Sequence, residues 1–155
     1  MANFVQKLGL ENHQEIVVLN APKEFAAELT NLRKTFQVAV SLKKSKSVSF
    51  ILVFVKAQKE VDMLIPALTA RLSPEVVLWM AYPDGSSKKY RTEITRDKGW
   101  DILGTHGFQS IRRQTLDDDW SALCFQKIDY LKKSANDGDV LTNLSNDKRQ
   151  VKKSS

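Results

Sequence analysis

The stretch Glu15-Ile16-Val17-Val18-Leu19-Asn20, followed at once by Ala21-Pro22, decides the fold class of this chain. A short run of apolar and β-branched residues predicts a strand that is buried on both faces of a sheet. Pro22 suits the first position of a helix, because its missing N–H would have no partner there. Phe25, Leu29 and Leu32 then recur at helical spacing, which predicts an amphipathic helix reaching residue 34.

The alternation of strand and helix continues along the chain. Residues 48–55 and 76–81 form two further apolar strand patterns, and residues 1–10 are expected to form a short helix that ends at Gly9. Pro66 interrupts the helical stripe between the two strands, and it should kink that helix or mark its real start. The stripe consists of Val61, Leu64, Ile65, Leu68 and Leu72.

Residues 36–42 predict a second strand whose partner is less clear from the sequence. Only the polar residues 43–47 separate it from the next strand. A parallel crossover needs roughly a dozen residues or more. We therefore expect this strand either to pair antiparallel at that point or to form a frayed edge.

The C-terminal part of the sequence predicts a polar loop, a helix and a hairpin. Residues 82–89 carry turn-forming residues, and Thr95 is expected to cap a helix that runs to residue 105. Residues 108–115 and 120–128 predict an antiparallel hairpin with an acidic turn. The whole pattern predicts an α/β fold, a three-layer Rossmann-like, mostly parallel sheet with a C-terminal antiparallel hairpin.

We expect one domain over residues 1–130, followed by a basic and flexible tail over residues 131–155. The net charge is +6, and six basic against three acidic side chains in the tail supply half of it. The remaining +3 is ordinary for a folded domain, so nucleic acid is not the expected partner. No apolar run approaches the roughly 20 residues of a membrane span, and no signal peptide is evident, so we expect a cytoplasmic protein without a membrane partner.

The sequence lacks the residues that several kinds of functional site require. Cys124 is the one cysteine and sits in an apolar run, which predicts a buried structural thiol and excludes an internal disulfide. His13 and His106 lie in separate polar segments, so we expect neither a catalytic dyad nor a metal site. The acidic residues 117–119 are interpreted as a solvated turn. The chain also lacks a glycine-rich cofactor turn and a phosphate-binding loop, so we expect no catalytic residue and no cofactor.

A ligand of such a sheet would bind outside the carboxyl ends of the strands, where the strand order reverses. The two loops expected there follow the strands at residues 15–20 and 76–81. Hydroxyl and ammonium groups and helix N-termini in these loops suit an anion. The candidate ligand-binding residues are Asn20, Pro22, Tyr82, Ser86, Ser87, Lys88 and Thr95.

The chain resembles a family of small uncharacterised bacterial proteins, a domain of unknown function, over residues 7 to 125. The most specific segments are residues 18–22, 78–79 with 82–83, 86–88, 92–97 and 120–123. This resemblance implies relatives but no activity.

A more distant resemblance is to the Rossmann-like fold of class I methyltransferases. Residues 7–10 leading into 16–19, residues 49–55 with 64–78, and the hairpin that ends in Trp120-Ser121-Ala122-Leu123 are similar to parts of that fold. The resemblance implies S-adenosylmethionine as cofactor. The sequence departs from the family at Asn20-Ala21-Pro22, which replaces the glycine-rich turn, and at residues 43–47, where the unit with the acidic ribose-binding residue is shortened.

The leading hypothesis is a non-catalytic or degenerate Rossmann-like module that binds a small ligand or a protein partner at the carboxyl edge of the sheet. The alternative is a small S-adenosylmethionine-dependent methyltransferase with an atypical cofactor loop. A third hypothesis is nucleic-acid binding through residues 43–46, residues 88–91 and the tail. An open crevice beside Asn20, or one filled by Pro22, Tyr82 and Trp100, would discriminate between the first two. The oligomeric state stays open.

Overall fold

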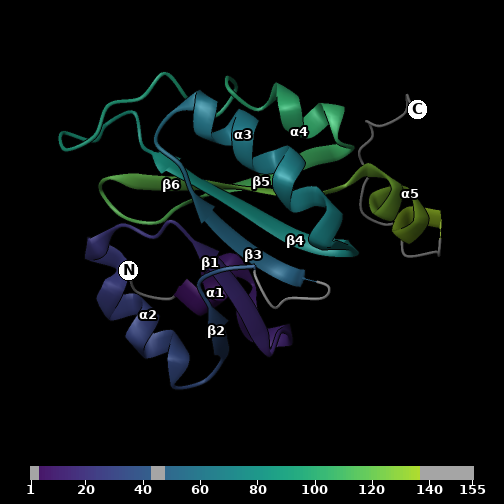
Figure 1. Cartoon of the computed structure of the whole chain (residues 1–155), viewed down its shortest axis with the longest axis horizontal. Coiled ribbons are helices and arrows are strands. Elements are labelled where there is room, and N and C mark those ends of the chain that lie inside the picture. Colours follow the sequence, from purple (N-terminus) through teal and green to yellow (C-terminus); the bar gives the residue numbers. More distant parts are fainter. Residues whose placement is uncertain (1–3, 43–47, 137–155) are drawn as a thin grey trace.

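The computed structural model describes residues 4–42 and 48–136 (Figure 1). Six strands form one sheet in the order β2-β1-β3-β4-β6-β5. The first four strands along the chain run parallel, and β6 pairs antiparallel with both β4 and β5. The strands are β1 (Glu15–Leu19), β2 (Gln37–Ala39), β3 (Val48–Phe54), β4 (Leu72–Pro83), β5 (Phe108–Thr115) and β6 (Trp120–Lys127). The predicted mostly parallel sheet with a closing hairpin is confirmed.

Helices cover both faces of this sheet, which gives three layers. The helices are α1 (Phe4–Leu8), α2 (Ala26–Arg33), α3 (Gln58–Leu68), α4 (Asp101–Thr105) and α5 (Ile128–Asn136). Side chains of α1 and α2 pack with one core cluster, and those of α3 and α4 pack with the other. Figure 1 shows α3 and α4 above the sheet and α2 below it.

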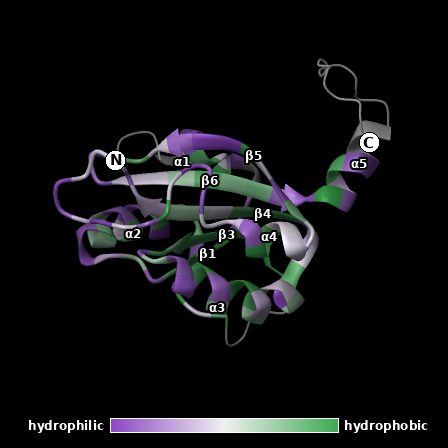
Figure 2. Ribbon diagram, turned by 90° about the horizontal axis from the view of Figure 1, so that it is seen from above, coloured by the Kyte–Doolittle hydropathy of each residue, from purple (hydrophilic) through white to green (hydrophobic). Residues whose placement is uncertain are grey.

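The apolar runs of the sequence explain why the middle of the sheet is buried on both faces. In β3 every residue except Ser49 is buried, and neighbouring residues alternate between the two clusters, as Ile51 and Leu52 do. In Figure 2 the middle strand β4 is largely hydrophobic, whereas the edge strand β5 is hydrophilic along much of its length. The sequence pattern therefore distinguishes interior strands from this edge.

β2 is an edge strand, as one of the two alternatives predicted. The other alternative, an antiparallel pairing, is wrong. β2 lies parallel to β1, with Ile16 opposite Val38. The prediction assumed that residues 43–47 connect two neighbouring strands, but β2 and β3 are not neighbours in the sheet. β2 neighbours β1, and the segment that joins them contains α2, which is long enough for a parallel crossover. Residues 43–47 themselves lie outside the described residues.

Two predicted helix starts are wrong. Pro66 lies inside α3, which begins upstream at Gln58, so it does not mark the start of that helix. Thr95 caps no helix, because α4 begins only at Asp101. The Thr95 hydroxyl instead accepts the N–H of Asp97 in a local turn, a competing use of a threonine side chain that the sequence pattern does not distinguish from a cap.

Two further expectations, at Pro22 and after Tyr130, also differ from the structure. Pro22 precedes a short 3-10 helix, Lys23–Phe25, and α2 follows that turn, so Pro22 is not the first residue of the α-helix. α5 continues past Tyr130 and contacts β4 and β6, so the helix replaces the flexible chain expected over residues 131–136. Residues 137–155 lie outside the described residues. Within the described residues no helix is long and apolar enough to cross a membrane.

Candidate functional site: a crevice at the carboxyl edge of the sheet

The sheet order creates a crevice beside Asn20. β1 has β2 on one side and β3 on the other, so the strand order reverses between β1 and β3. At their carboxyl ends lies a hollow of about 280 Å³, which we call the switch-point crevice. It is lined by Asn20, Phe54, Lys56, Glu60 and Trp120. The crevice is thus lined by none of the three side chains, Pro22, Tyr82 and Trp100, that could have filled it.

Asn20 adopts the backbone conformation that usually calls for glycine. Its φ angle is 61°, and it is the only residue other than glycine with a positive φ in the described chain. Asparagine tolerates this left-handed region better than other L-residues do. The chain therefore turns sharply away from β1 without the glycine whose absence the sequence shows.

Replacing Asn20 tests this conformation. We expect Asn20→Val to lower the free energy of unfolding by about 1–2 kcal/mol, because a branched residue is strained in the left-handed region. Asn20→Gly should leave the stability unchanged or raise it. Urea unfolding followed by circular dichroism measures both, and equal midpoints for the valine and glycine variants would contradict the assigned turn.

Lys56 and Glu60 form the polar wall of the crevice. Both follow β3, where Glu60 in the first turn of α3 accepts the backbone N–H of Lys56 at 2.5 Å. The Lys56 ammonium is exposed and lies 4.8 Å from the centre of the Tyr90 ring. The wall therefore offers a cation and a carboxylate four residues apart, just before and within the first turn of α3.

The floor of the crevice is aromatic and rigidly held. Trp120 at the start of β6 is fully buried, and its ring meets Phe54 edge-on with the ring centres 5.1 Å apart. The Tyr90 ring also packs against the indole, with its ring centre 5.1 Å away. These contacts join β3, β6 and the loop after β4 beneath the crevice.

Glu24 holds the loop after β4 against the start of α2. Its carboxylate accepts hydrogen bonds from the Tyr90 hydroxyl at 2.6 Å and from the Trp120 indole N–H at 3.2 Å, and it lies 3.5 Å from the Lys89 ammonium. The hydrogen bond from Tyr90, helped by that from Trp120, lowers the pKa of Glu24 to about 2. The same hydrogen bond raises the pKa of Tyr90 to about 12. The carboxylate is therefore ionised and fully engaged at neutral pH.

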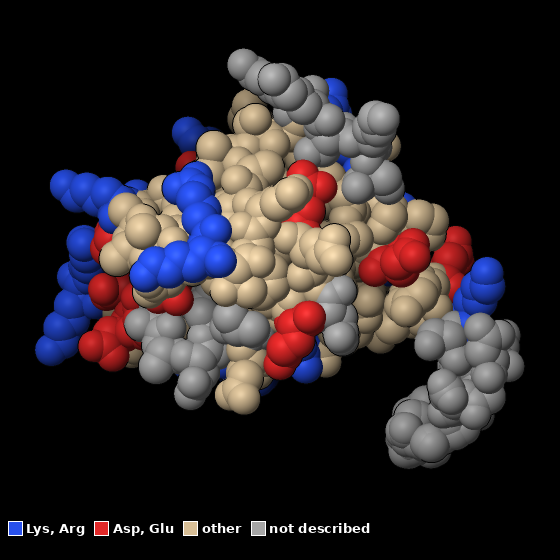
Figure 3. All heavy atoms as spheres, turned by 90° about the horizontal axis from the view of Figure 1, so that it is seen from below, with Lys and Arg blue, Asp and Glu red and all other residues tan. Residues whose placement is uncertain are grey.

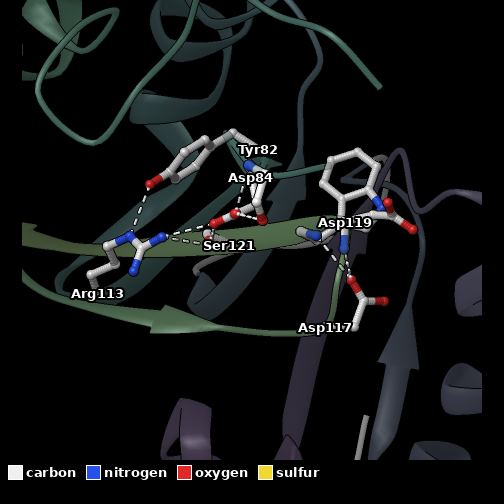
Figure 4. A network of polar contacts seen from close by, with 8 residues as sticks. Tyr82, Asp84, Arg113, Asp117, Asp119 and Ser121 are labelled. Atoms are coloured by element: carbon white, nitrogen blue, oxygen red, sulfur yellow. Dashed lines mark hydrogen bonds and ion pairs between the residues drawn. The ribbon is translucent and has the colours of Figure 1, made fainter. Parts of the chain in front are cut away.

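A second polar network closes the hairpin against β4 (Figure 4). The Asp84 carboxylate accepts hydrogen bonds from the Ser121 hydroxyl at 2.6 Å and from Arg113 Nη2 at 2.9 Å, and Ser86 donates to its other oxygen. Arg113 Nε donates to the Tyr82 hydroxyl at 3.2 Å. The hydrogen bond from Ser121, followed by those from Ser86, lowers the pKa of Asp84 to about 2.

These two carboxylates make the stability depend on pH in a defined direction. Their pKa values lie near 2 in the fold and at 4.5 for Glu24 and 3.8 for Asp84 without it. A lowered pKa stabilises the fold fully above the ordinary value, and this contribution is lost as the pH falls from about 4.5 towards 2. We expect the gap in urea midpoint between the wild type and Glu24→Gln to be largest at pH 7 and to narrow by pH 3. A gap that stays constant or widens on acidification would show that Glu24 is not held as described.

The structure separates the candidate residues chosen from the sequence. Asn20 lines the switch-point crevice, whereas Tyr82 and Thr95 line a second hollow. Pro22 follows Asn20 in the same loop but lines neither hollow. The Ser86 hydroxyl donates to Asp84, and the Ser87 hydroxyl donates to Asp119 while accepting two backbone N–H groups. Lys88 is exposed in that loop. A ligand role for these residues stays a prediction.

Other sequence-based expectations can be located directly. Cys124 is buried, and burial raises the pKa of its thiol to about 12, which confirms an inert core position. Asp117 accepts the N–H groups of Asp119 and Trp120 and so shapes the hairpin turn. His106 is tied to the carbonyl of Ile102 in α4. Among the described residues no group of three or more potential ligands could hold a metal ion.

Sequence reasoning missed four of the five residues that line the crevice. Phe54 and Lys56 lie at the end of the strongest strand pattern, and Glu60 lies in the first turn of the helix that follows, so the rule that placed a ligand at carboxyl ends could have found them. Trp120 could not be found this way, because it comes from the hairpin, which reaches the crevice only through the order of the strands.

The comparisons with known proteins identify the class of fold. A S-adenosylmethionine-dependent methyltransferase from Aquifex aeolicus superposes with a TM-score of 0.55 at 12% identity, covering 78% of this chain and 86% of that one. The M1A22 tRNA methyltransferase TrmK of B. subtilis gives a TM-score of 0.51 at 12% identity, covering 91% and 71%. The mitomycin 7-O-methyltransferase MmcR gives 0.52 at 9% identity, and this chain spans 50% of its length.

These similarities show the fold and nothing finer. The chain has the Rossmann-like fold of S-adenosylmethionine-dependent methyltransferases, which confirms the distant resemblance that its sequence suggested. No protein-family model matches the chain, and no curated protein matches it.

Proposed function

We propose that this chain binds an adenosyl compound of the S-adenosylmethionine class in the switch-point crevice and works as a small methyltransferase-like enzyme. The observation that carries the proposal is the position of the crevice at the point where the strand order reverses, next to a residue in the left-handed turn conformation. Ligands of open α/β sheets bind at this point. The methyltransferase fold of the chain supports the choice of ligand.

The residues of the crevice suit such a ligand in their chemistry. Glu60 offers a carboxylate for ribose hydroxyls, and Lys56 offers a cation for the carboxylate of the amino-acid part. The Asn20 side chain offers both donor and acceptor groups. Trp120 and Phe54 supply an apolar floor for the remaining atoms. The volume of about 280 Å³ is close to the lower end, roughly 300 Å³, of small-molecule pockets, so part of the ligand would remain in contact with water.

When bound, S-adenosylmethionine supplies an electrophilic methyl group. The chain would contribute positioning, since the floor is rigid and the wall carries the two opposite charges. Figure 3 shows Lys and Arg side chains, with acidic ones among them, projecting from the left end of the molecule, where Figure 1 places the loop after β4.

One observation favours the non-catalytic module as the second candidate. The carboxylates nearest the crevice already accept hydrogen bonds, Glu24 from Tyr90 and Trp120, and Glu60 from the backbone of Lys56. A carboxylate engaged in this way is a poor general base. A binding module with this crevice would hold the ligand without transferring its methyl group.

A thermal-shift panel tests the proposal. S-adenosylmethionine and S-adenosylhomocysteine should raise the melting temperature in a saturable way, by the equivalent of about 2.7 kcal/mol at a ligand concentration one hundred times the Kd. ATP, adenosine and inorganic phosphate serve as controls. Stabilisation by the adenosyl compounds with methyl transfer to an added acceptor pool supports the enzyme, and stabilisation without transfer supports the second candidate. No stabilisation by either compound would overturn both.

A further inference from the structure

A second hollow lies at the carboxyl edge, on the side of β4 that faces α3 and α4. It has a volume of about 270 Å³ and is lined by Tyr82, Gly85, Ile94, Thr95, Arg96 and Arg113. Tyr82 and Ile94 belong to the core cluster of α3 and α4, whereas Trp120 of the switch-point crevice belongs to the other cluster. The two hollows therefore open on opposite faces of the sheet.

The loop that forms this hollow is firmly built. Residues 84–100 contain no helix or strand, and loops of this length without secondary structure are usually either functional or disordered. Ile94 is buried in the core, and the Trp100 indole N–H donates to the carbonyl of Thr95 at 2.7 Å. Gly99 has a φ angle of 110°, and a Cβ there would meet Ile94 at 3.3 Å. The turn that carries Arg96 is thus held in place from both sides.

Two donor groups of the hollow have no acceptor among the described residues, and a third group, Arg96, is held only weakly. Arg113 donates from Nε to Tyr82 and from Nη2 to Asp84 and Ser121. Its third nitrogen, Nη1, makes no hydrogen bond to a described residue. In Figure 4 this third nitrogen points away from both Asp84 and the Tyr82 hydroxyl, so Arg113 contributes its charge to the hollow. The Tyr82 hydroxyl accepts from Arg113 and donates to no described residue, although Tyr82 is only 2% exposed. Arg96 makes one exposed ion pair, 3.5 Å to Asp97, a kind of contact that holds an arginine weakly.

The charges of the hollow favour an anion. Two guanidinium groups line it and no carboxylate does. Asp84, the acidic group closest to Arg113, is already saturated by Ser121, Ser86 and Arg113 itself. The hydrogen bond to Tyr82 raises the pKa of Arg113, so this guanidinium stays charged. A ligand here must therefore bring acceptor atoms and negative charge.

We propose that this second hollow binds a phosphate group, held by Arg96 and by the hydroxyl proton of Tyr82 beside the charged guanidinium of Arg113. Phosphate suits two cations and a hydroxyl donor better than a singly charged carboxylate does, because it carries more charge and more acceptor oxygens. The side chain of Ile94 offers an apolar contact for the group that bears the phosphate. This inference does not rest on the adenosyl ligand proposed for the other face.

An NMR titration with inorganic phosphate tests the site on the intact chain. At constant ionic strength, the amide signals of Gly85, Thr95 and Arg96 should shift and saturate with phosphate, shift less with acetate, and stay in place with chloride. Arg96→Gln should weaken phosphate binding roughly tenfold or more, the loss expected for one charge-assisted hydrogen bond. Tyr82→Phe removes the hydroxyl proton and should weaken binding by a smaller factor.

Arg112→Gln is the matched control. Arg112 neighbours Arg113 on β5, but its guanidinium lies over the Trp79 ring, 5.4 Å from the ring centre, on the other face of the sheet. It removes the same charge and should leave the phosphate titration unchanged. Equal weakening by Arg96→Gln and Arg112→Gln, shifts centred on Lys88 and Lys89, or no saturation in the wild type would each overturn the proposal. None of these outcomes bears on the adenosyl ligand, which is absent from the experiment.

Discussion

Trp120→Ala is expected to lower the free energy of unfolding by about 3–5 kcal/mol, the usual cost of truncating a buried tryptophan. The indole is fully buried between Phe54 and Tyr90, and its N–H donates to Glu24. Truncation would leave a cavity beneath the crevice and remove a hydrogen bond from the Glu24 carboxylate. Urea unfolding monitored by circular dichroism measures the loss.

Trp120→Phe is the informative companion variant. It keeps most of the ring packing but removes the N–H, so the loss should be clearly smaller, about 1–3 kcal/mol. Equal losses for the alanine and phenylalanine variants would mean that the hydrogen bond to Glu24, and not the packing, carries the contribution of Trp120. A loss below 1 kcal/mol for Trp120→Ala would contradict the buried floor altogether.

Trp79→Ala is expected to have a comparable effect, about 3–5 kcal/mol, together with a local consequence at the N-terminus. Trp79 in β4 is fully buried and donates its indole N–H to the carbonyl of Leu8 at 3.1 Å. Its loss removes one of the contacts that fasten α1 to the sheet, beside the hydrogen bond from Lys7 to the carbonyl of Thr115. We expect faster amide hydrogen exchange over residues 4–12 in excess of the change elsewhere.

Met63→Ala serves as the control for this second variant. Met63 lies on α3 and is 74% exposed, so its truncation should change the unfolding free energy by no more than about 0.5 kcal/mol. If Trp79→Ala raises hydrogen exchange uniformly over the chain, with no excess over residues 4–12, α1 is not fastened through this side chain.

The fold followed from the sequence wherever local patterns decide it. Apolar β-branched runs define β1, β3 and the buried part of β4, and the hairpin follows from two strand patterns on either side of an acidic turn. The direction of β2 was less accessible, because three residues beside a polar segment do not reveal which strand they join. Thr95 illustrates the same limit: a threonine before an acidic residue serves a turn as well as a helix cap.

The candidate site could be predicted from the sequence only in part, for a physical reason. Asn20 could be found because it directly follows the first strand, β1. Its conformation could not, since a positive φ at asparagine leaves no mark in the sequence. The rest of the crevice is assembled by the order β1-β3-β4-β6, which brings Trp120 close to Lys56 across more than sixty positions of sequence. The absence of a glycine-rich turn suggested that no cofactor would bind, and the turn at Asn20 weakens that argument.

Calorimetric titration with S-adenosylhomocysteine tests the central claim, that the switch-point crevice holds an adenosyl ligand. We predict saturable binding at one site in the wild type, weakened at least roughly tenfold by Lys56→Glu, because the charge reversal repels the ligand's carboxylate. Lys59→Glu makes the same charge change three residues further along the chain. Lys59 is exposed and does not line the crevice, so this variant should leave the Kd unchanged. No binding by the wild type, or equal weakening by the two variants, would contradict the account.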